Sequence, residues 1–145
     1  MKIGEFLKSA QQRLVTCTPD DTLETAAKLL HAHRIGAMPV CQMTRMVGIV
    51  SERDLVRTFA TQTGDLRNMR VRDVMTTRVI SCGPDDSMQA AQDLMRKNRF
   101  RHLPVVENGR VLAILSIRDT LALRLQESEF EINVLRDVVV AARYR

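Results

Sequence analysis

The chain contains an internal repeat, and no other feature restricts its fold as strongly. Shifting residues 15–55 by 65 positions aligns them with residues 80–120 without a gap, and 14 of the 41 aligned positions are identical. A unit this short does not bury its apolar face alone, so two copies must cover each other's apolar surface. We therefore predict two units packed about a pseudo-twofold axis, with any bound molecule at the seam between them.

The composition is that of one compact module. The 145 residues are 45% hydrophobic but only 3% aromatic, which predicts a core of Val, Leu, Ile, Met and Ala. No apolar run exceeds about five residues, whereas a membrane-spanning helix needs about 20. The first eight residues lack the apolar stretch of a signal peptide. The sequence therefore predicts a cytoplasmic protein without a membrane partner.

Each copy shows the same order of elements. A short β-prone run precedes a turn, an amphipathic helix of about three turns, two further β-prone runs and a second helix. The β-prone runs are 14–18, 37–40 and 46–50 in the first copy, and 79–82, 102–106 and 111–115 in the second. Suitable N-caps for the first helix of each copy are Asp21 or Thr22, and Asp86 or Ser87. The predicted fold class is α/β (α+β), with two β-α-β-β-α repeats.

The repeat also sets the expected boundaries along the chain. We place the first repeat, with its lead-in and a linker, at residues 2–67, and the second repeat at residues 68–125. Residues 71–75 resemble the lead-in at residues 3–7. A C-terminal helical extension is expected at residues 126–145.

The C-terminal tail has the spacing of a heptad seam. From Asp119 onward no Gly or Pro interrupts the chain, which predicts a long helix. The residues at alternating steps of four and three are Leu121, Leu125, Ser128, Ile132, Leu135, Val139 and Ala142. This seam favours contact between two copies in a homodimer. Packing of the same stripe on the protein's own surface is the alternative.

Both copies carry the pattern Ser-x-x-Asp directly after their last β-prone run. Ser51 precedes Asp54, and Ser116 precedes Asp119 at the equivalent place. Serine is a good N-cap, and an acidic residue is favourable in the first turn of a helix. Helix capping alone would therefore explain one such pattern, and a binding role draws its support from the matched second copy.

The order of motifs resembles a known family. A proline–valine pair, a hairpin, a small residue with two apolar ones and then Ser-x-x-Asp occur twice within about 120 residues. This resembles a tandem pair of cystathionine beta-synthase (CBS) domains, the Bateman module, over about residues 2–125. The resemblance implies a stand-alone regulatory module that binds an adenosine-containing nucleotide in the cleft between the repeats. AMP, ADP, ATP and NAD are the expected ligands, S-adenosylmethionine is less favoured, and an unidentified protein is the expected regulated partner.

The resemblance also implies roles for individual residues. Asp54 and Asp119 would accept hydrogen bonds from the vicinal hydroxyls of a ribose, and Ser51 and Ser116 would present hydroxyl and N–H groups to a phosphate. The other implied residues are Arg101 and His102 at phosphate, Ile35 and Phe100 beside adenine, and Thr16 and Ser81 near its polar edge. Arg53 and Arg118 would reach phosphate or pair with neighbouring acids. An exposed strand end is the alternative for Arg101 and His102, and core packing is the alternative for Ile35 and Phe100.

Other chemistry finds little support in the sequence. No motif of a nucleophilic, nucleotide-hydrolysing or dinucleotide-dependent enzyme is present, so we expect no catalytic residue, no catalytic cofactor and no enzyme activity. Cys17, Cys41 and Cys82 lack metal-ligand spacing and are predicted to be buried thiols, so no metal site is expected. Two alternative functions remain: a structural interaction module with vestigial pockets, and nucleic-acid binding through a surface with net charge +5.

Overall fold

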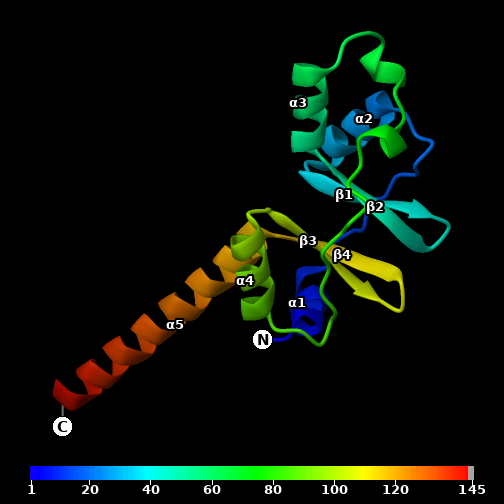
Figure 1. The fold of residues 1–145 in the computed structure, drawn as a ribbon. Helices are drawn as coiled ribbons and strands as arrows, with labels where there is room; N and C mark the ends of the chain where they lie inside the picture. The colour runs from blue at the N-terminus through cyan, green and yellow to red at the C-terminus, as the bar shows by residue number, and fades with distance from the viewer. Residues whose placement is uncertain (144–145) are drawn as a thin grey trace.

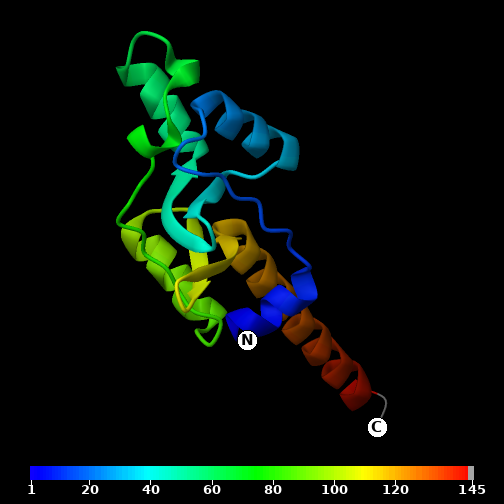
Figure 2. The same cartoon turned by 90° about the vertical axis from the view of Figure 1, so that its right-hand side faces the viewer.

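A computed structural model of the chain describes residues 1–143. Its elements are α1 (Ile3–Ala10), α2 (Leu23–His33), β1 (Ala37–Gln42), β2 (Arg45–Ser51), α3 (Glu52–Thr61), η1 (Leu66–Asn68), η2 (Val71–Asp73), α4 (Met88–Asn98), β3 (His102–Glu107), β4 (Arg110–Ser116) and α5 (Ile117–Arg143). The two repeats form two lobes, and α5 projects from the second lobe (Figures 1 and 2). The predicted fold of two mixed helix–strand repeats with a long C-terminal helix is confirmed. Residues 144–145 of the predicted extension lie outside the described residues.

The two lobes share one four-stranded sheet. β1 pairs with β2 in one antiparallel hairpin, and β3 pairs with β4 in another. The strand order is β1-β2-β4-β3, and the two hairpins meet through a single pair, Arg45 opposite Arg110. These two arginines are equivalent under the 65-residue shift, so the contact lies on the pseudo-twofold axis. The seam predicted from the repeat is therefore the junction of the two hairpins.

The first β-prone run of each copy is reduced to a single bridge, where the sequence predicts a short strand. Cys17 donates its N–H to the Pro39 carbonyl (3.1 Å) and accepts from the Cys41 N–H (2.8 Å). A longer parallel ladder would need the N–H groups of Pro39 and Pro19, and proline has none. The equivalent residues of the second copy are Cys82, Pro104 and Pro84. Residues 14–16 and 79–81 are therefore left without ladder partners.

The helix starts follow the predicted caps. The Thr22 Oγ1 accepts from the Thr25 N–H at the start of α2, and the Ser87 Oγ accepts from the Ala90 N–H at the start of α4. Both helices end at an arginine in the left-handed region. Arg34 has φ 52° and Arg99 has φ 57°, and each closes its helix with backbone hydrogen bonds to the last turn. At each of these caps the chain changes direction and enters the strand that follows, β1 after α2 and β3 after α4.

The lead-in of each repeat packs on the other repeat. Ile3 is fully buried in the core of the second repeat, and its N–H donates to the Asp86 carbonyl (2.9 Å). Val71 is buried in the core of the first repeat, and its N–H donates to the Asp21 carbonyl (2.8 Å). The boundaries at residues 2–67 and 68–125 describe chain order, whereas the packing crosses them. This exchange ties the two lobes together at both ends of the first repeat.

The cores contain aliphatic side chains and two of the three cysteines. Cys17 lies in the first core and Cys82 in the second, and both are free thiols. Burial raises the pKa of Cys17 to about 12 and that of Cys82 to about 11. Burial also raises the pKa of Cys41. The thiols are therefore protonated and unreactive at neutral pH, and the prediction that they are buried is confirmed.

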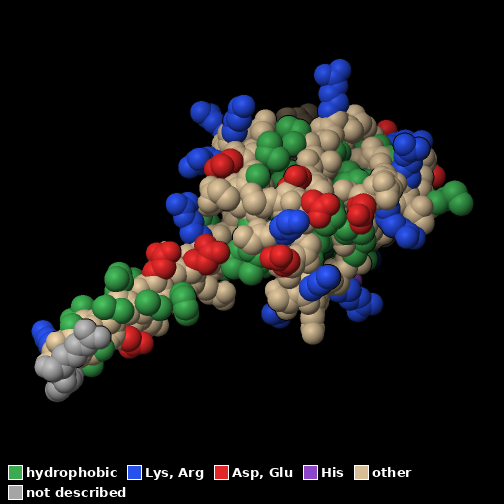
Figure 3. Space-filling model, turned by 90° about the horizontal axis from the view of Figure 1, so that it is seen from below, with side chains coloured by type: hydrophobic (Ala, Val, Ile, Leu, Met, Phe, Trp, Pro, Cys, Tyr) green, Lys and Arg blue, Asp and Glu red, His purple; other side chains and the backbone are tan. Residues whose placement is uncertain are grey.

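α5 has 27 residues, and those that are not exposed lie between Ile117 and Leu123, in its first two turns. Thr120 is buried there, and Leu123 packs against the core of the second repeat. Beyond this point the helix exposes apolar side chains along its length (Figure 3). Of the helices within residues 1–143, none combines the length and the apolar character that a bilayer crossing requires.

Candidate functional site

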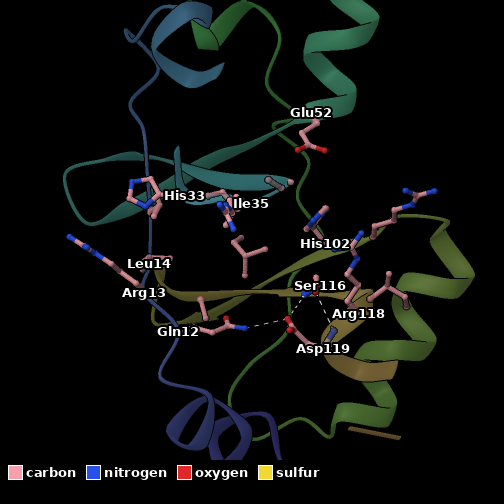
Figure 4. A pocket seen from close by; sticks show the side chains of 18 residues that line it. Gln12, Arg13, Leu14, His33, Ile35, Glu52, His102, Ser116, Arg118 and Asp119 are labelled. Carbon is pink, nitrogen blue, oxygen red and sulfur yellow. Dashed lines mark hydrogen bonds between the residues drawn. The ribbon is translucent and has the colours of Figure 1, made fainter. Parts of the chain in front are cut away.

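Within residues 1–143, two clefts open along the seam between the repeats. The first cleft has a volume of about 610 Å³ and lies between the end of α2 and the start of β1 on one side and the start of α5 on the other (Figure 4). The second cleft has a volume of about 210 Å³ and lies between the end of β2 and the start of β3. The predicted site residues in the first cleft are Ile35, Arg101, His102, Ser116, Arg118 and Asp119. Those in the second cleft are Ser51, Arg53, Asp54, Phe100, Arg101 and His102.

The clefts are related by the internal repeat. Residues 35–37 line the first cleft, and residues 100–102, which lie 65 positions later, line the second. The Ser-x-x-Asp segment of each cleft comes from the opposite repeat. Each cleft therefore combines the strand start of one copy with the helix start of the other, as the predicted binding at the seam requires.

Ser51 and Asp54 form a capping box at the start of α3. The Asp54 Oδ2 accepts hydrogen bonds from the Ser51 N–H (2.8 Å) and the Ser51 hydroxyl (3.0 Å). The Ser51 Oγ accepts in turn from the Asp54 N–H (3.3 Å). The other oxygen, Oδ1, accepts from the Arg57 guanidinium, and the whole residue is 5% exposed. Both carboxylate oxygens of Asp54 are therefore engaged within α3.

Ser116 and Asp119 repeat this arrangement at the start of α5 with one difference. The Asp119 Oδ2 accepts from the Ser116 N–H (2.8 Å), and the Ser116 Oγ accepts from the Asp119 N–H (3.2 Å). The Gln12 amide, which extends from the chain after α1, also donates to this oxygen (3.3 Å; Figure 4). Within residues 1–143 no hydrogen bond engages Oδ1 of Asp119. This half-buried carboxylate lines the first cleft, and the lone pairs of one of its oxygens are thus available.

The first backbone N–H group of α3 and that of α5 already have acceptors. The Glu52 N–H donates to the Gly36 carbonyl (2.9 Å), and the Ile117 N–H donates to the Arg101 carbonyl (2.8 Å). These hydrogen bonds leave little of either helix N-terminus for an anion. The phosphate-binding role of Ser51 and Ser116 therefore stays a prediction, and arginine side chains are the stronger candidates for phosphate.

The first cleft is rich in cationic side chains. Its lining includes Arg13, Arg34, Arg101 and Arg118, together with the acidic residues Glu52 and Asp119. A phosphate group would find bidentate partners among these arginines. The second cleft has Arg53, Arg78 and Arg101 at a third of the volume.

His102 lies between the two clefts and lines both. Burial lowers the pKa of its imidazole, and the carboxylates of Glu52 and Asp119 only partly oppose this effect. The side chain is therefore neutral at pH 7 in the absence of a bound anion. It lies so close to Gly36 that a Cβ there would come within 2.9 Å of the imidazole. The missing side chain at position 36 makes room for His102.

Two predicted residues lie apart from the clefts. Thr16 and Ser81 are exposed and line neither cleft, so their contact with an adenine stays a prediction. The sequence analysis missed several lining residues, including Arg13, His33 and Arg34 of the first cleft and Arg78 of the second. Arg13 and Arg78 are equivalent under the 65-residue shift, so extending the repeat by two residues would have found them. Across residues 1–143 no cluster of three His, Cys, Asp or Glu side chains is suited to hold a metal ion.

Comparison with known proteins agrees with this geometry. The family model for the CBS domain matches residues 3–61 and 71–125. A mitochondrial CBS domain-containing protein of Arabidopsis thaliana is 32% identical over 133 residues, which are 88% of this chain and 65% of that protein. A crystal structure of a CBS-domain protein from Agrobacterium tumefaciens superposes with a TM-score of 0.80 at 36% identity, covering 86% of this chain and 99% of that one.

A third relative carries a ligand. The CBS domain protein of Pyrobaculum aerophilum, complexed with AMP, is 29% identical with a TM-score of 0.73, and the match covers 82% of this chain and 89% of that one. The chain therefore belongs to the CBS domain family and contains a tandem pair of these domains. CBS pairs are regulatory modules rather than catalysts, so the prediction that the chain is not an enzyme is confirmed.

Proposed function

We propose that the chain is a regulatory module that binds an adenine nucleotide, with AMP as the reference ligand, at the seam between its two CBS repeats. The observation that carries this proposal is a cleft of about 610 Å³ that brings a carboxylate with an available oxygen and four arginines to one place. Cavities that bind small molecules have volumes of about 300–1,000 Å³. The AMP complex of the related Pyrobaculum aerophilum protein supports the choice of ligand.

We propose separate contacts for the ribose, the adenine and the phosphate of the nucleotide. The Asp119 Oδ1 accepts hydrogen bonds from the ribose hydroxyls, a role that suits a carboxylate with one oxygen already fixed by Ser116. The side chain of Ile35 offers an apolar face to the adenine. Arg101 and Arg118 pair with the phosphate, and a neutral His102 adds a hydrogen bond or takes up a proton.

A ligand in this position touches both repeats at once. It therefore stabilises the arrangement of lobes that places its contacts correctly and disfavours others. A partner protein that distinguishes these arrangements would then bind differently in the presence of nucleotide.

A cytoplasmic location stays a prediction, and the Arabidopsis relative is named as mitochondrial.

The two alternatives have less support. An interaction module with vestigial pockets would leave no reason for an available carboxylate oxygen in a cationic cleft. Binding of nucleic acid would favour aromatic side chains for base stacking and a continuous basic stripe, whereas aromatics are 3% of the chain. We retain both alternatives as outcomes of the test below.

The proposed partner of α5 is a second copy of this chain. In the heptad register, Leu125, Ile132 and Val139 occupy a positions, and Leu121 and Leu135 occupy d positions. Leucine at d with β-branched residues at a favours two parallel strands. The larger apolar residues of the seam are exposed in the single chain, so a second helix would bury them (Figure 3).

The charges beside this seam match a parallel, in-register pair. The g position Arg124 lies opposite the partner's Glu129 at e, and the g position Glu131 lies opposite the partner's Arg136 at e. Both pairs are of opposite sign, and symmetry makes each occur twice. We therefore propose a homodimer in which the two α5 helices run parallel.

Calorimetric titration with AMP, ADP, ATP, NAD and S-adenosylmethionine, with GMP as the control, tests the function. We expect saturable heat with the adenine nucleotides and a matching rise in the melting temperature. A flat titration with every adenosine compound would contradict the proposal and favour the vestigial-pocket alternative. Binding that is found only with DNA or RNA and falls steeply with salt would favour the third function.

A further inference from the structure

We infer that the module binds one nucleotide per chain, in the first cleft, and that its second cleft does not take a nucleotide. This inference rests on the proposed function and adds which cleft is used. It depends on differences between residues at equivalent positions of the two repeats. Three such differences act in the same direction.

The first difference is the state of the two carboxylates. In the first repeat the Arg57 guanidinium, one helical turn after Asp54, engages the Asp54 Oδ1. The residue equivalent to Arg57 in the second repeat is Ala122, which has no donor to offer. Asp119 therefore keeps its Oδ1 without a hydrogen bond among residues 1–143, whereas both oxygens of Asp54 already accept hydrogen bonds and a ribose would compete with Arg57 for its Oδ1.

The second difference is the size of the residues at the strand start. The first cleft is lined by Ile35, Gly36 and Ala37, and the second by Phe100, Arg101 and His102 in the equivalent places. The larger side chains of the second repeat fill their own cleft. The volume of the second cleft is accordingly about 210 Å³, below the range of cavities that hold drug-sized ligands.

The third difference concerns the basic residues Arg101 and His102, which line both clefts. Because Gly36 and Ala37 are small, Arg101 and His102 reach across the axis and line the first cleft as well. The first cleft is thus lined by four arginines and His102, whereas three arginines and His102 line the much smaller second cleft. The second cleft gains only Ala37 from the matching segment of the first repeat.

The test is calorimetric titration of the full chain with AMP, using matched variants. We expect about one AMP per chain for the wild type. Asp119→Asn should weaken binding at least tenfold, and Asp54→Asn should change it less than twofold. Both substitutions alter a capping box, so thermal unfolding without AMP shows whether they destabilise the fold to the same degree.

A second pair of variants tests whether an arginine placed like Arg57 blocks the first cleft. Ala122→Arg places on α5 the guanidinium that engages Asp54 on α3, and it should weaken AMP binding at least fivefold by occupying Asp119. Ala122→Met, an unbranched side chain without a hydrogen-bond donor, should bind AMP within twofold of the wild type. This control separates the ion pair from simple bulk.

The outcomes distinguish this inference from the proposed function. Two equivalent AMP sites, or equal losses in Asp54→Asn and Asp119→Asn, would overturn the single-cleft inference while nucleotide binding stands. Loss of binding in Asp54→Asn alone would overturn it as well. An absence of AMP binding by the wild type would contradict the proposed function itself.

Discussion

The two repeats differ at the residues that begin β1 and β3, which line the clefts at the seam. The identical positions, among them Pro39 and Pro104, keep the backbone of both copies alike. The small residues Gly36 and Ala37 face Arg101 and His102 of the other copy, and this inequality opens one cleft and fills the other. The repeat therefore preserves the architecture, and a few unequal positions decide where a ligand fits.

The buried His102 predicts a dependence of stability on pH. Because burial lowers the pKa of His102 in the folded protein, the unfolded chain binds more protons as the pH falls through about 6.5, the ordinary pKa of histidine. The stability that neutral His102 contributes is present above that pH and is lost below it. Urea unfolding at pH 7.5 and 5.5 should therefore show a smaller loss for His102→Asn than for the wild type. An identical loss in both proteins would contradict this, and the exposed His31, changed to Asn, serves as the control.

Sequence reasoning named several residues that line the first cleft but not its whole lining. Asp119, Arg101 and His102 could be predicted from the sequence because they belong to motifs that occur at fixed places in the repeat. His33 and Arg34 were missed because they end α2, and only the packing of the two lobes brings them to the cleft. The ion pair of Arg57 with Asp54 was missed for a different reason, since a spacing of three in a helix permits such a contact without requiring it.

At the scale of elements, the helices and hairpins followed from local sequence, and the leading strands did not. Apolar spacing and N-caps locate α2 and α4, because these features act within one helix. The runs at residues 14–18 and 79–82 have strand composition, but prolines on both sides of each bridge remove the donors of a longer ladder. Composition alone does not reveal which N–H groups a neighbouring strand would need.

The tips of the two hairpins predict a stabilising substitution. Met43 has φ 56° and is 99% exposed, whereas the equivalent residue of the second hairpin is Asn108 with φ 53°. Asparagine tolerates the left-handed region better than methionine does. Met43→Asn should therefore raise the free energy of unfolding by about 0.5 kcal/mol, measured by denaturant unfolding. A decrease would contradict the assignment of strain to this tip, and Thr44→Asn is the neighbouring control.

At the scale of the whole molecule, the exchanged lead-ins and α5 determine the assembly. Ile3 completes the core of the second repeat, and Val71, which begins the second lead-in, completes the core of the first. Sequence similarity between the two lead-ins was visible, but their exchange was not, because a pseudo-twofold pair is compatible with either arrangement. α5 then carries its exposed apolar heptad residues away from both lobes (Figure 1).

The proposed parallel pairing of α5 is tested by reversing charges. Glu131→Arg and Arg136→Glu, each alone, place like charges opposite one another in the dimer and should shift the protein toward monomer. The double variant restores opposite charges and should recover the dimer. Light scattering coupled to size-exclusion chromatography at low salt measures the mass of each. A double variant that dissociates as readily as the single ones would contradict the parallel register.

The most direct measurement is a crystal structure of the chain grown with AMP. We predict one AMP in the first cleft, with its ribose hydroxyls on the Oδ1 of Asp119 and its phosphate among Arg101, Arg118 and the neighbouring arginines. AMP bound away from the seam, or an Asp119 carboxylate that makes no contact with the ribose, would contradict the account.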